Sequence, residues 1–263
     1  MVRHERQSRS FCAGAGPGGP AVSLIIPARN EERGLGGTLN AALRAVENYR
    51  QRTATSDPSA EIIVVDNQST DGTWELLQNY AKRYGIRPVQ FAAVGAARAR
   101  NHGRQLAQGR ILVFIDADTH IPVEAVSQIV EHCERGGKQA GITSLAALDG
   151  GWRAWCWWQF WGQVRRFPLP RAKAMPALMF CTTLAFDEFG PFDEAVAIGE
   201  EWPILAGLYR TRPQQFIYDR TLVAQTSSRR MERQRFGYVR TFLKYIWAIL
   251  HYAGRVEYSD HIR

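Results

Sequence analysis

The stretch Ile111-Leu112-Val113-Phe114-Ile115-Asp116-Ala117-Asp118-Thr119 is an apolar run that ends in two carboxylates one residue apart. Five consecutive apolar residues predict a strand covered on both faces, and the acids then fall at its carboxyl end, where open α/β sheets bind ligands. Side chains two residues apart on an extended chain point the same way, roughly 6–7 Å apart, so Asp116 and Asp118 could share one hard cation. The alternative is that the acids only begin a loop or cap a helix.

Strands and helices are predicted to alternate along the chain before this motif. Such alternation is typical of an α/β fold with a doubly wound, mostly parallel, Rossmann-like sheet. Because crossovers between parallel strands are right-handed, the loops after Ile26, Val65 and Ile115 should converge on one cleft. Apolar runs and helical periodicity predict strands and helices in turn over Val22–Ile26, Leu35–Arg50, Glu61–Val65, Thr70–Tyr84, Pro88–Phe91 and Ala96–Ala107.

The pattern becomes less regular toward the C-terminus. A helix is predicted over Pro122–Gly136, strands over Gly141–Leu148 and Phe180–Phe186, a helix over Glu200–Tyr209, and a long C-terminal helix over Met231–Arg255. Pro203 is compatible with the fourth of these because proline is tolerated in the first turn of a helix.

Composition is that of an ordinary globular chain of 263 residues, with 45% apolar and 22% charged residues. Of the net charge of +8, more than half lies in residues 226–263, which contain eight Lys or Arg and three acids. This asymmetry suggests an anionic partner, whether phosphate, nucleic acid or a membrane surface, although a solvated basic helix would look the same.

The N-terminal residues 1–20 are rich in Gly, Pro and Arg and contain no apolar segment, so a disordered leader is expected there. Four cysteines far apart in the sequence predict neither a disulfide framework nor a zinc site, and a cytoplasmic location is the simple inference. The apolar window from Phe242 to Ala253 is too short and too polar to span a bilayer.

A tryptophan-rich segment, Trp152–Trp161, holds five of the eight tryptophans. Indole faces could stack on an acceptor sugar or lipid, or the segment could lie at a membrane interface beside Arg165 and Arg166. Core packing together with a dimer face would use aromatic residues equally well.

Polar loops follow the other predicted strands. Asp66 ends a β-branched strand and could accept hydrogen bonds from a base or ribose, whereas Ser69, Thr70 and Asp71 suit helix capping. Farther along, Arg98, Arg100 and Asn101 lie on a helix whose glycine-containing start would let phosphate approach, and arginine forks bind phosphate oxygens well.

Five ordered motifs over about 95 residues resemble the nucleotide-sugar-binding half of family 2 glycosyltransferases of the GT-A type. They are Pro27-Ala28-Arg29-Asn30-Glu31, Asp66 with Ser69–Thr73, Gly95 with Ala99–Gly103, Gly109-Arg110-Ile111 and Asp116-Ala117-Asp118. The resemblance implies a nucleoside diphosphate sugar donor, a divalent cation (Mg²⁺ or Mn²⁺) and inversion at the anomeric carbon. It divides the chain into a nucleotide-sugar-binding half (21–136), an acceptor-binding half (137–230) and a C-terminal basic and aromatic helix (231–263).

Residue roles carried over from the family follow the same motifs. Asp118 would be the metal ligand, with Asp116 close to the metal and the ribose. Glu201, or its neighbour Glu200, would be the catalytic base, although the family usually has Glu-Asp at this point. The other donor-binding residues would be Pro27, Ala28, Arg29, Glu31, Asp66, Arg98, Arg100, Asn101, Ala117, Arg229 and Arg230.

One acid pair cannot serve both halves of the displacement. A metal at Asp116 and Asp118 would neutralise the leaving diphosphate, while a carboxylate on the opposite face of the sugar removes the proton from the acceptor hydroxyl. Taken alone, Glu200 and Glu201 would be ordinary acids at a helix N-terminus, where they complement the dipole. The processive Gln-x-x-Arg-Trp signature is absent, so a single transfer is expected.

Two other functions fit parts of the sequence. The run Phe114–Thr119 also matches the Asp-x-Asp-x-Thr signature of haloacid-dehalogenase-like phosphatases, although that family carries it on its first strand. A non-catalytic scaffold at a membrane is the other alternative. For the glycosyltransferase, the acceptor could be lipid-linked or a small molecule, with peripheral contact at the inner face of the membrane, a possible homodimer and no nucleic acid partner.

Overall fold

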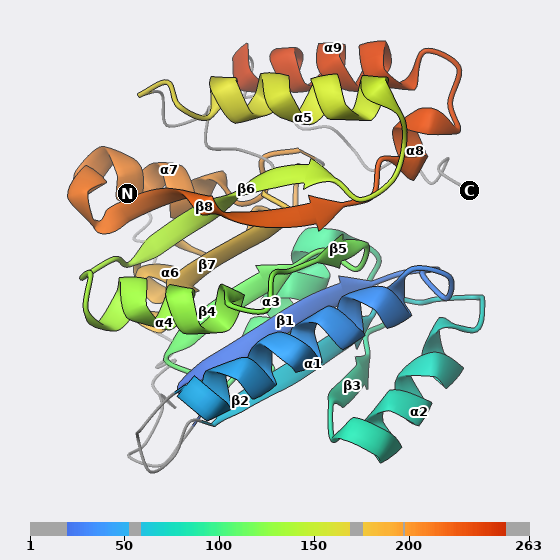
Figure 1. The fold of residues 1–263 in the computed structure, drawn as a ribbon, viewed down its shortest axis with the longest axis vertical. Helices are drawn as coiled ribbons and strands as arrows, with labels where there is room; N and C mark the ends of the chain where they lie inside the picture. Colours follow the sequence, from blue (N-terminus) through green and yellow to red (C-terminus); the bar gives the residue numbers. More distant parts are fainter. Residues whose placement is uncertain (1–19, 53–58, 169–175, 197, 251–263) are drawn as a thin grey trace, which may run out of the picture.

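A computed structural model describes residues 20–52, 59–168, 176–196 and 198–250 (Figure 1). Its centre is one eight-stranded sheet with the strand order β3-β2-β1-β4-β7-β6-β8-β5. The expected leader lies outside the described residues apart from Pro20, and so does the expected helix beyond residue 250.

The first half of the chain forms the parallel part of the sheet, as the alternation predicts. β1 lies between β2 and β4, with Ile25 opposite Ile63 on one side and Phe114 on the other. β3 adds in parallel to the outer side of β2. The elements are β1 (Val22–Ala28), α1 (Leu35–Arg52), β2 (Ala60–Asp66), α2 (Thr73–Tyr84), β3 (Arg87–Gln90), α3 (Ala96–Leu106) and β4 (Ile111–Ile115).

The second half extends the same sheet with mixed pairing. β7 is antiparallel to β4 and β6, β8 is parallel to β6, and β5 is antiparallel to β8. The sheet is therefore mostly parallel, and each of its antiparallel pairs includes a strand of this half. The elements are β5 (Thr119–His120), α4 (Ala125–Glu134), β6 (Ala140–Ala147), α5 (Trp152–Val164), β7 (Leu178–Thr182), α6 (Thr183–Phe189), α7 (Trp202–Thr211), a 3₁₀ turn (Pro213–Gln215), β8 (Phe216–Thr226), α8 (Arg229–Glu232) and α9 (Gly237–Leu250).

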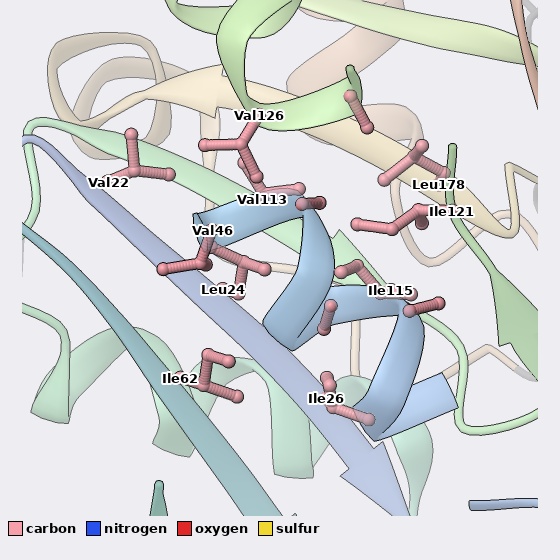
Figure 2. Packing of buried hydrophobic residues seen from close by; sticks show 14 of the residues in the cluster. Val22, Leu24, Ile26, Val46, Ile62, Val113, Ile115, Ile121, Val126 and Leu178 are labelled. Carbon is pink, nitrogen blue, oxygen red and sulfur yellow. The ribbon is translucent and has the colours of Figure 1, made fainter. Parts of the chain in front are cut away.

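Both faces of the central strands are buried, which explains the uninterrupted apolar run in β4. Val113 and Ile115 point to the side of α1 and α4, where they pack with Leu24 and Val46 (Figure 2). Leu112 and Phe114 belong to the cluster on the opposite face, which includes residues of α6 and α7. Because strand side chains alternate, such a double cover requires an apolar residue at every position.

Two sequence-based expectations for the second half are wrong in detail. The strand expected over Phe180–Phe186 ends at Thr182, whose hydroxyl accepts a hydrogen bond from the N–H of Ala185 and caps α6. The long helix expected over Met231–Arg255 is interrupted between α8 and α9. At this break Phe236 has φ of 57°, and a Cβ on Gly237 would lie 2.1 Å from the Met231 carbonyl oxygen. A continuous helix is incompatible with both features.

The order of the parallel strands locates the ligand edge. From β1 the chain steps to β2 and β3 in one direction, and β4 then adds on the other side of β1. The loops after β1 and β4 therefore diverge at a topological switch point, where open α/β sheets have their ligand crevice. Among the described residues, none of the helices combines the length and the hydropathy that crossing a bilayer requires.

Candidate active site

A cavity of about 400 Å³ lies at this switch point. The loops after β1 and β4 form one side, the start of α7 forms another, and α5 with α9 contributes aromatic side chains. The predicted site residues that line it are Pro27, Ala28, Arg29, Glu31, Arg100, Asp116, Ala117, Asp118, Glu200, Glu201 and Arg230. The convergence of separate loops that the sequence predicts is thus confirmed in space.

The acidic loop after β4 is fixed by its backbone. The carbonyl oxygen of Ala117 accepts a hydrogen bond from the Thr38 hydroxyl at 2.8 Å, which ties the loop to α1. The carbonyl oxygen of Asp118 accepts one from the N–H of Ser227 at 3.1 Å, which ties it to the end of β8. Asp116 and Asp118 are thus presented to the cavity from a braced turn, which keeps the positions of their carboxylates defined.

The two carboxylates have the chemistry of a hard-cation site. Burial, followed by the neighbouring charge of Asp116, raises the pKa of Asp118 to about 6, although the charge of Arg230 lowers it. A divalent cation would relieve that repulsion, and carboxylate oxygens are ligands that Mg²⁺ and Mn²⁺ accept. Within the described ranges, no group of three His, Cys, Asp or Glu side chains is arranged to hold a metal.

Arg100 joins Asp116 to the start of α7. Its guanidinium lies 2.5 Å from Asp116 and 2.8 Å from Glu200, and its side chain is buried. Burial alone would lower the pKa of Arg100, but Asp116 and then Glu200 raise it above its usual value. A buried arginine held by two carboxylates is fixed and charged, so its position between the two acids is defined.

The two consecutive glutamates differ in their surroundings. Burial raises the pKa of Glu200 despite the opposing charge of Arg100. Glu201 is buried beside Arg165 and Tyr245, two residues that also line the cavity. Burial, together with the charges of Glu200 and Glu201, raises the pKa of Tyr245 to about 12. Glu200 therefore forms an ion pair with Arg100, whereas Glu201 interacts with Arg165 and Tyr245.

Three other predicted donor-binding residues do not line the cavity. Asp66 is buried and accepts a hydrogen bond from the N–H of Ser69 at 3.3 Å. Asn101 donates to the Phe192 carbonyl oxygen at 3.0 Å, and Arg98 lies 3.6 Å from Glu194. None of these three side chains is among the groups that line the cavity.

Asn67 directly follows Asp66 at the end of β2. Its side-chain oxygen accepts a hydrogen bond from the N–H of Gly95 at 2.8 Å, and its side-chain nitrogen donates to the Ala93 carbonyl oxygen at 2.5 Å. Asn67 also lines the cavity. An amide can donate and accept at once, so this residue ties the loop after β2 to the start of α3, which a carboxylate could not do.

The short basic helix α8 lies against the acids of the first half. Arg229 and Arg230 both contact the Glu31 carboxylate, and Arg229 also lies 3.9 Å from Asp118. The preceding Ser228 accepts a hydrogen bond from the indole N–H of Trp158 at 3.1 Å. Residues almost 200 positions apart in sequence therefore meet at one edge of the cavity.

Arg165 and Tyr245 were not predicted as site residues. The sequence suggested that Arg165 flanks a membrane-interface segment, but the side chain is buried in the cavity wall. Burial lowers its pKa, opposed by contacts with Tyr218 and Tyr245. An arginine next to a run of tryptophans without any nearby acid was the available signal, because a buried guanidinium needs partners from elsewhere in the fold.

The sequence is similar to those of known glycosyltransferases. Residues 23–193 match the model of a family described as glycosyl transferase family 2. One similar curated protein is the undecaprenyl-phosphate 4-deoxy-4-formamido-L-arabinose transferase of Pseudomonas syringae, 29% identical over 142 residues, which are 51% of this chain and 39% of that protein. Another is the putative teichuronic acid biosynthesis glycosyltransferase TuaG of Bacillus subtilis, 36% identical over 136 residues, or 50% of each protein. The chain thus spans half or less of the length of these relatives.

Solved structures show the same fold. The mannosyltransferase PcManGT from Pyrobaculum calidifontis, determined in complex with GDP-Man and Mn²⁺, superposes with a TM-score of 0.63 at 18% identity, covering 92% of this chain and 66% of that one. The predicted GT-A type α/β fold is therefore confirmed. The family match gives no support to the phosphatase or the scaffold, the two alternatives that the sequence left open.

Proposed function

Because the chain belongs to glycosyl transferase family 2, we propose that it transfers a sugar from a nucleoside diphosphate sugar to an acceptor hydroxyl, once per encounter and with inversion. The observation that carries the proposal is the meeting of the Asp116–Asp118 turn, the Arg229–Arg230 helix and the Glu200–Glu201 pair around one cavity at the sheet switch point. Acids on two sides of a cavity are what an in-line displacement requires.

On the donor side, the nucleoside would bind against the cavity wall formed by Pro27, Ala28 and Arg29. Asp66, at the end of the neighbouring strand β2, would hold the base. Asp118 and Asp116 would hold a divalent cation, which when bound supplies positive charge against the leaving diphosphate. Arg229 and Arg230 lie next to these acids and would bind the phosphate oxygens by charge-assisted hydrogen bonds. When the donor binds, Arg229 and Arg230 would exchange their contact with the Glu31 carboxylate for contacts with the diphosphate.

On the acceptor side, we assign the base to Glu201. Glu200 is held by Arg100 at 2.8 Å, so its carboxylate is engaged in that ion pair and serves to position the loop. Glu201 is the remaining acid of this segment and lies in the same cavity wall as Arg165 and Tyr245. It would take the proton from the acceptor hydroxyl at a carboxylate oxygen, while Glu200 and Arg100 hold the loop in place.

The test separates donor binding from transfer. Uridine, guanosine and thymidine diphosphate sugars are screened with Mn²⁺ by thermal shift, and slow hydrolysis of the responding donor is followed as transfer to water. Glu201→Gln should keep the donor-induced shift and lose at least about 100-fold in turnover, as expected when a general base is removed. Glu200→Gln should impair both measurements. No thermal response to any donor, or full turnover by Glu201→Gln, would refute the proposal.

A further inference from the structure

Helices α5 and α9 form a layer at one end of the molecule, where they lie side by side (Figure 1). They are joined by aromatic contacts: the rings of Trp157 and Tyr245 are 6.0 Å apart, those of Trp161 and Tyr245 are 5.5 Å apart, and those of Phe160 and Phe242 are 5.7 Å apart. Trp157, Trp161 and Tyr245 also line the cavity. The inner side of this layer is therefore used by the active site.

The outer side of the layer is apolar and exposed. On α9, Val239, Leu243 and Leu250 follow one another at helical spacing, and Leu243 and Leu250 are 60% and 66% exposed. On α5, Trp152 and Trp155 are 74% and 62% exposed. Scattered surface apolar residues are normal, but a stripe of large ones on two adjacent helices marks a binding surface.

The charged side chains that α5 and α9 themselves carry are all positive. Arg240 and Lys244 are exposed next to Val239 and Leu243 on α9, and Arg153 is exposed next to Trp152 on α5. The sequences 151–168 and 233–250 contain no Asp or Glu. A second copy of the chain docked on this face by a two-fold axis would oppose like charges, which is destabilising.

We propose that the outer face of α5 and α9 docks peripherally on a bilayer that contains anionic lipids. Tryptophan, leucine and basic side chains on one helical surface are the composition of a segment that lies in the interface, with its apolar residues in the headgroup region and its cations at lipid phosphates. Docking on this face would bring the aromatic wall of the cavity close to the lipid. This last consequence rests on the proposed function and makes a lipid-linked acceptor the substrate class.

The experiment is sedimentation of the full chain with vesicles of phosphatidylcholine alone or mixed equally with phosphatidylglycerol. The double variant Arg240→Gln/Lys244→Gln should lose roughly tenfold or more of its partition to anionic vesicles, since each cation near such a surface contributes about fivefold. The control is Lys82→Gln/Arg83→Gln on α2, an exposed basic pair on another part of the surface. It should bind like the unaltered chain.

The apolar part is tested in the same way. Leu243→Ser/Leu250→Ser should abolish sedimentation with anionic vesicles, whereas Leu184→Ser, which changes an even more exposed leucine on α6, should not. All variants should keep their donor-induced thermal shift, so vesicle binding without any donor response would refute the proposed function alone. Absence of vesicle binding, equal loss in the controls, or a dimer that Leu243→Ser/Leu250→Ser dissociates would overturn the docking proposal.

Discussion

Replacing Asp118 by asparagine should stabilise the protein in the absence of cations and remove its response to them. The carboxylate has a pKa of about 6 in the fold against an ordinary value of 3.8, chiefly because it is buried and secondly because Asp116 lies nearby. A shift of about 2 units corresponds to about 3 kcal/mol of destabilisation once the group is ionised. Asparagine has nearly the same shape without the charge, so Asp118→Asn should recover much of that free energy at pH 7.5.

The size of the effect is measurable by thermal unfolding. With an unfolding entropy of about 2.1 cal/mol/K per residue, a chain of this length gains roughly 2 °C in Tm per kcal/mol, so the variant should unfold about 3–6 °C higher. The sign with pH follows from the raised pKa. Protonated Asp118 is favoured by folding, so its penalty is absent below 3.8 and complete above about 6. The gain in Tm should therefore shrink as the pH is lowered from 7.5 to 4.

Asp71 serves as the control, because its pKa is shifted in the opposite direction from that of Asp118. Burial raises the pKa of Asp71, but several hydrogen bonds, first those from the side chain and backbone of Thr73 and then one from the backbone of Glu32, together lower it by more, and the net shift is downward. Asp71→Asn should therefore lower the Tm at pH 7.5. With Mn²⁺ and a donor present, the unaltered chain should gain stability and Asp118→Asn should not. An Asp118→Asn variant that is less stable than the parent without cations, or whose gain does not depend on pH, would refute the reasoning.

Three further variants test other contacts. Arg100→Met should lower the free energy of unfolding by about 1–3 kcal/mol, measured by urea denaturation, because it leaves the partly buried carboxylates of Asp116 and Glu200 without their cation; an unchanged midpoint would contradict this. Gly103→Ala should cost about 1–3 kcal/mol in the same assay, since its Cβ would lie 2.4 Å from the Ile25 side chain across the α3–β1 contact. Glu31→Gln should speed tryptic cleavage after Arg229, because that arginine loses its carboxylate partner; an unchanged cleavage rate would show that other contacts hold α8.

The first half of the fold could be predicted because local sequence and tertiary environment agree. β1, β2 and β4 are buried on both faces, so a continuous apolar run is both the local signal and the packing requirement. Asp66 at the end of β2 and Asp116 after β4 lie at the carboxyl edge of the sheet, because these strands are parallel neighbours of β1. The convergence of the Pro27–Glu31 loop with Asp116 and Asp118 was therefore accessible from the sequence.

The second half could not be predicted as well because its signals are long-range. β8, an 11-residue strand that the sequence did not suggest, alternates imperfectly in burial and has a register shift against β6 between Thr143 and Ser144. Its interior Asp219 is stabilised by His132, 87 residues earlier. The tryptophan-rich α5 has apolar residues around most of its circumference, since one side faces the cavity and the other is exposed. No periodicity marks such a helix.

The side chain of Arg100 couples the two acidic groups of the cavity to each other. Because one guanidinium is shared by Asp116 and Glu200, whatever draws Asp116 toward a new positive charge also redistributes the hold on Glu200 and the adjoining Glu201. By thermodynamic reciprocity, if binding of a ligand at Asp116 changes the affinity for a second ligand at Glu200, then binding of that second ligand changes the affinity at Asp116 by the same factor. In the proposed function, donor binding at Asp116 would thereby change the acceptor wall at Glu200 and Glu201, and an acceptor bound at that wall would change the affinity for the donor by the same factor.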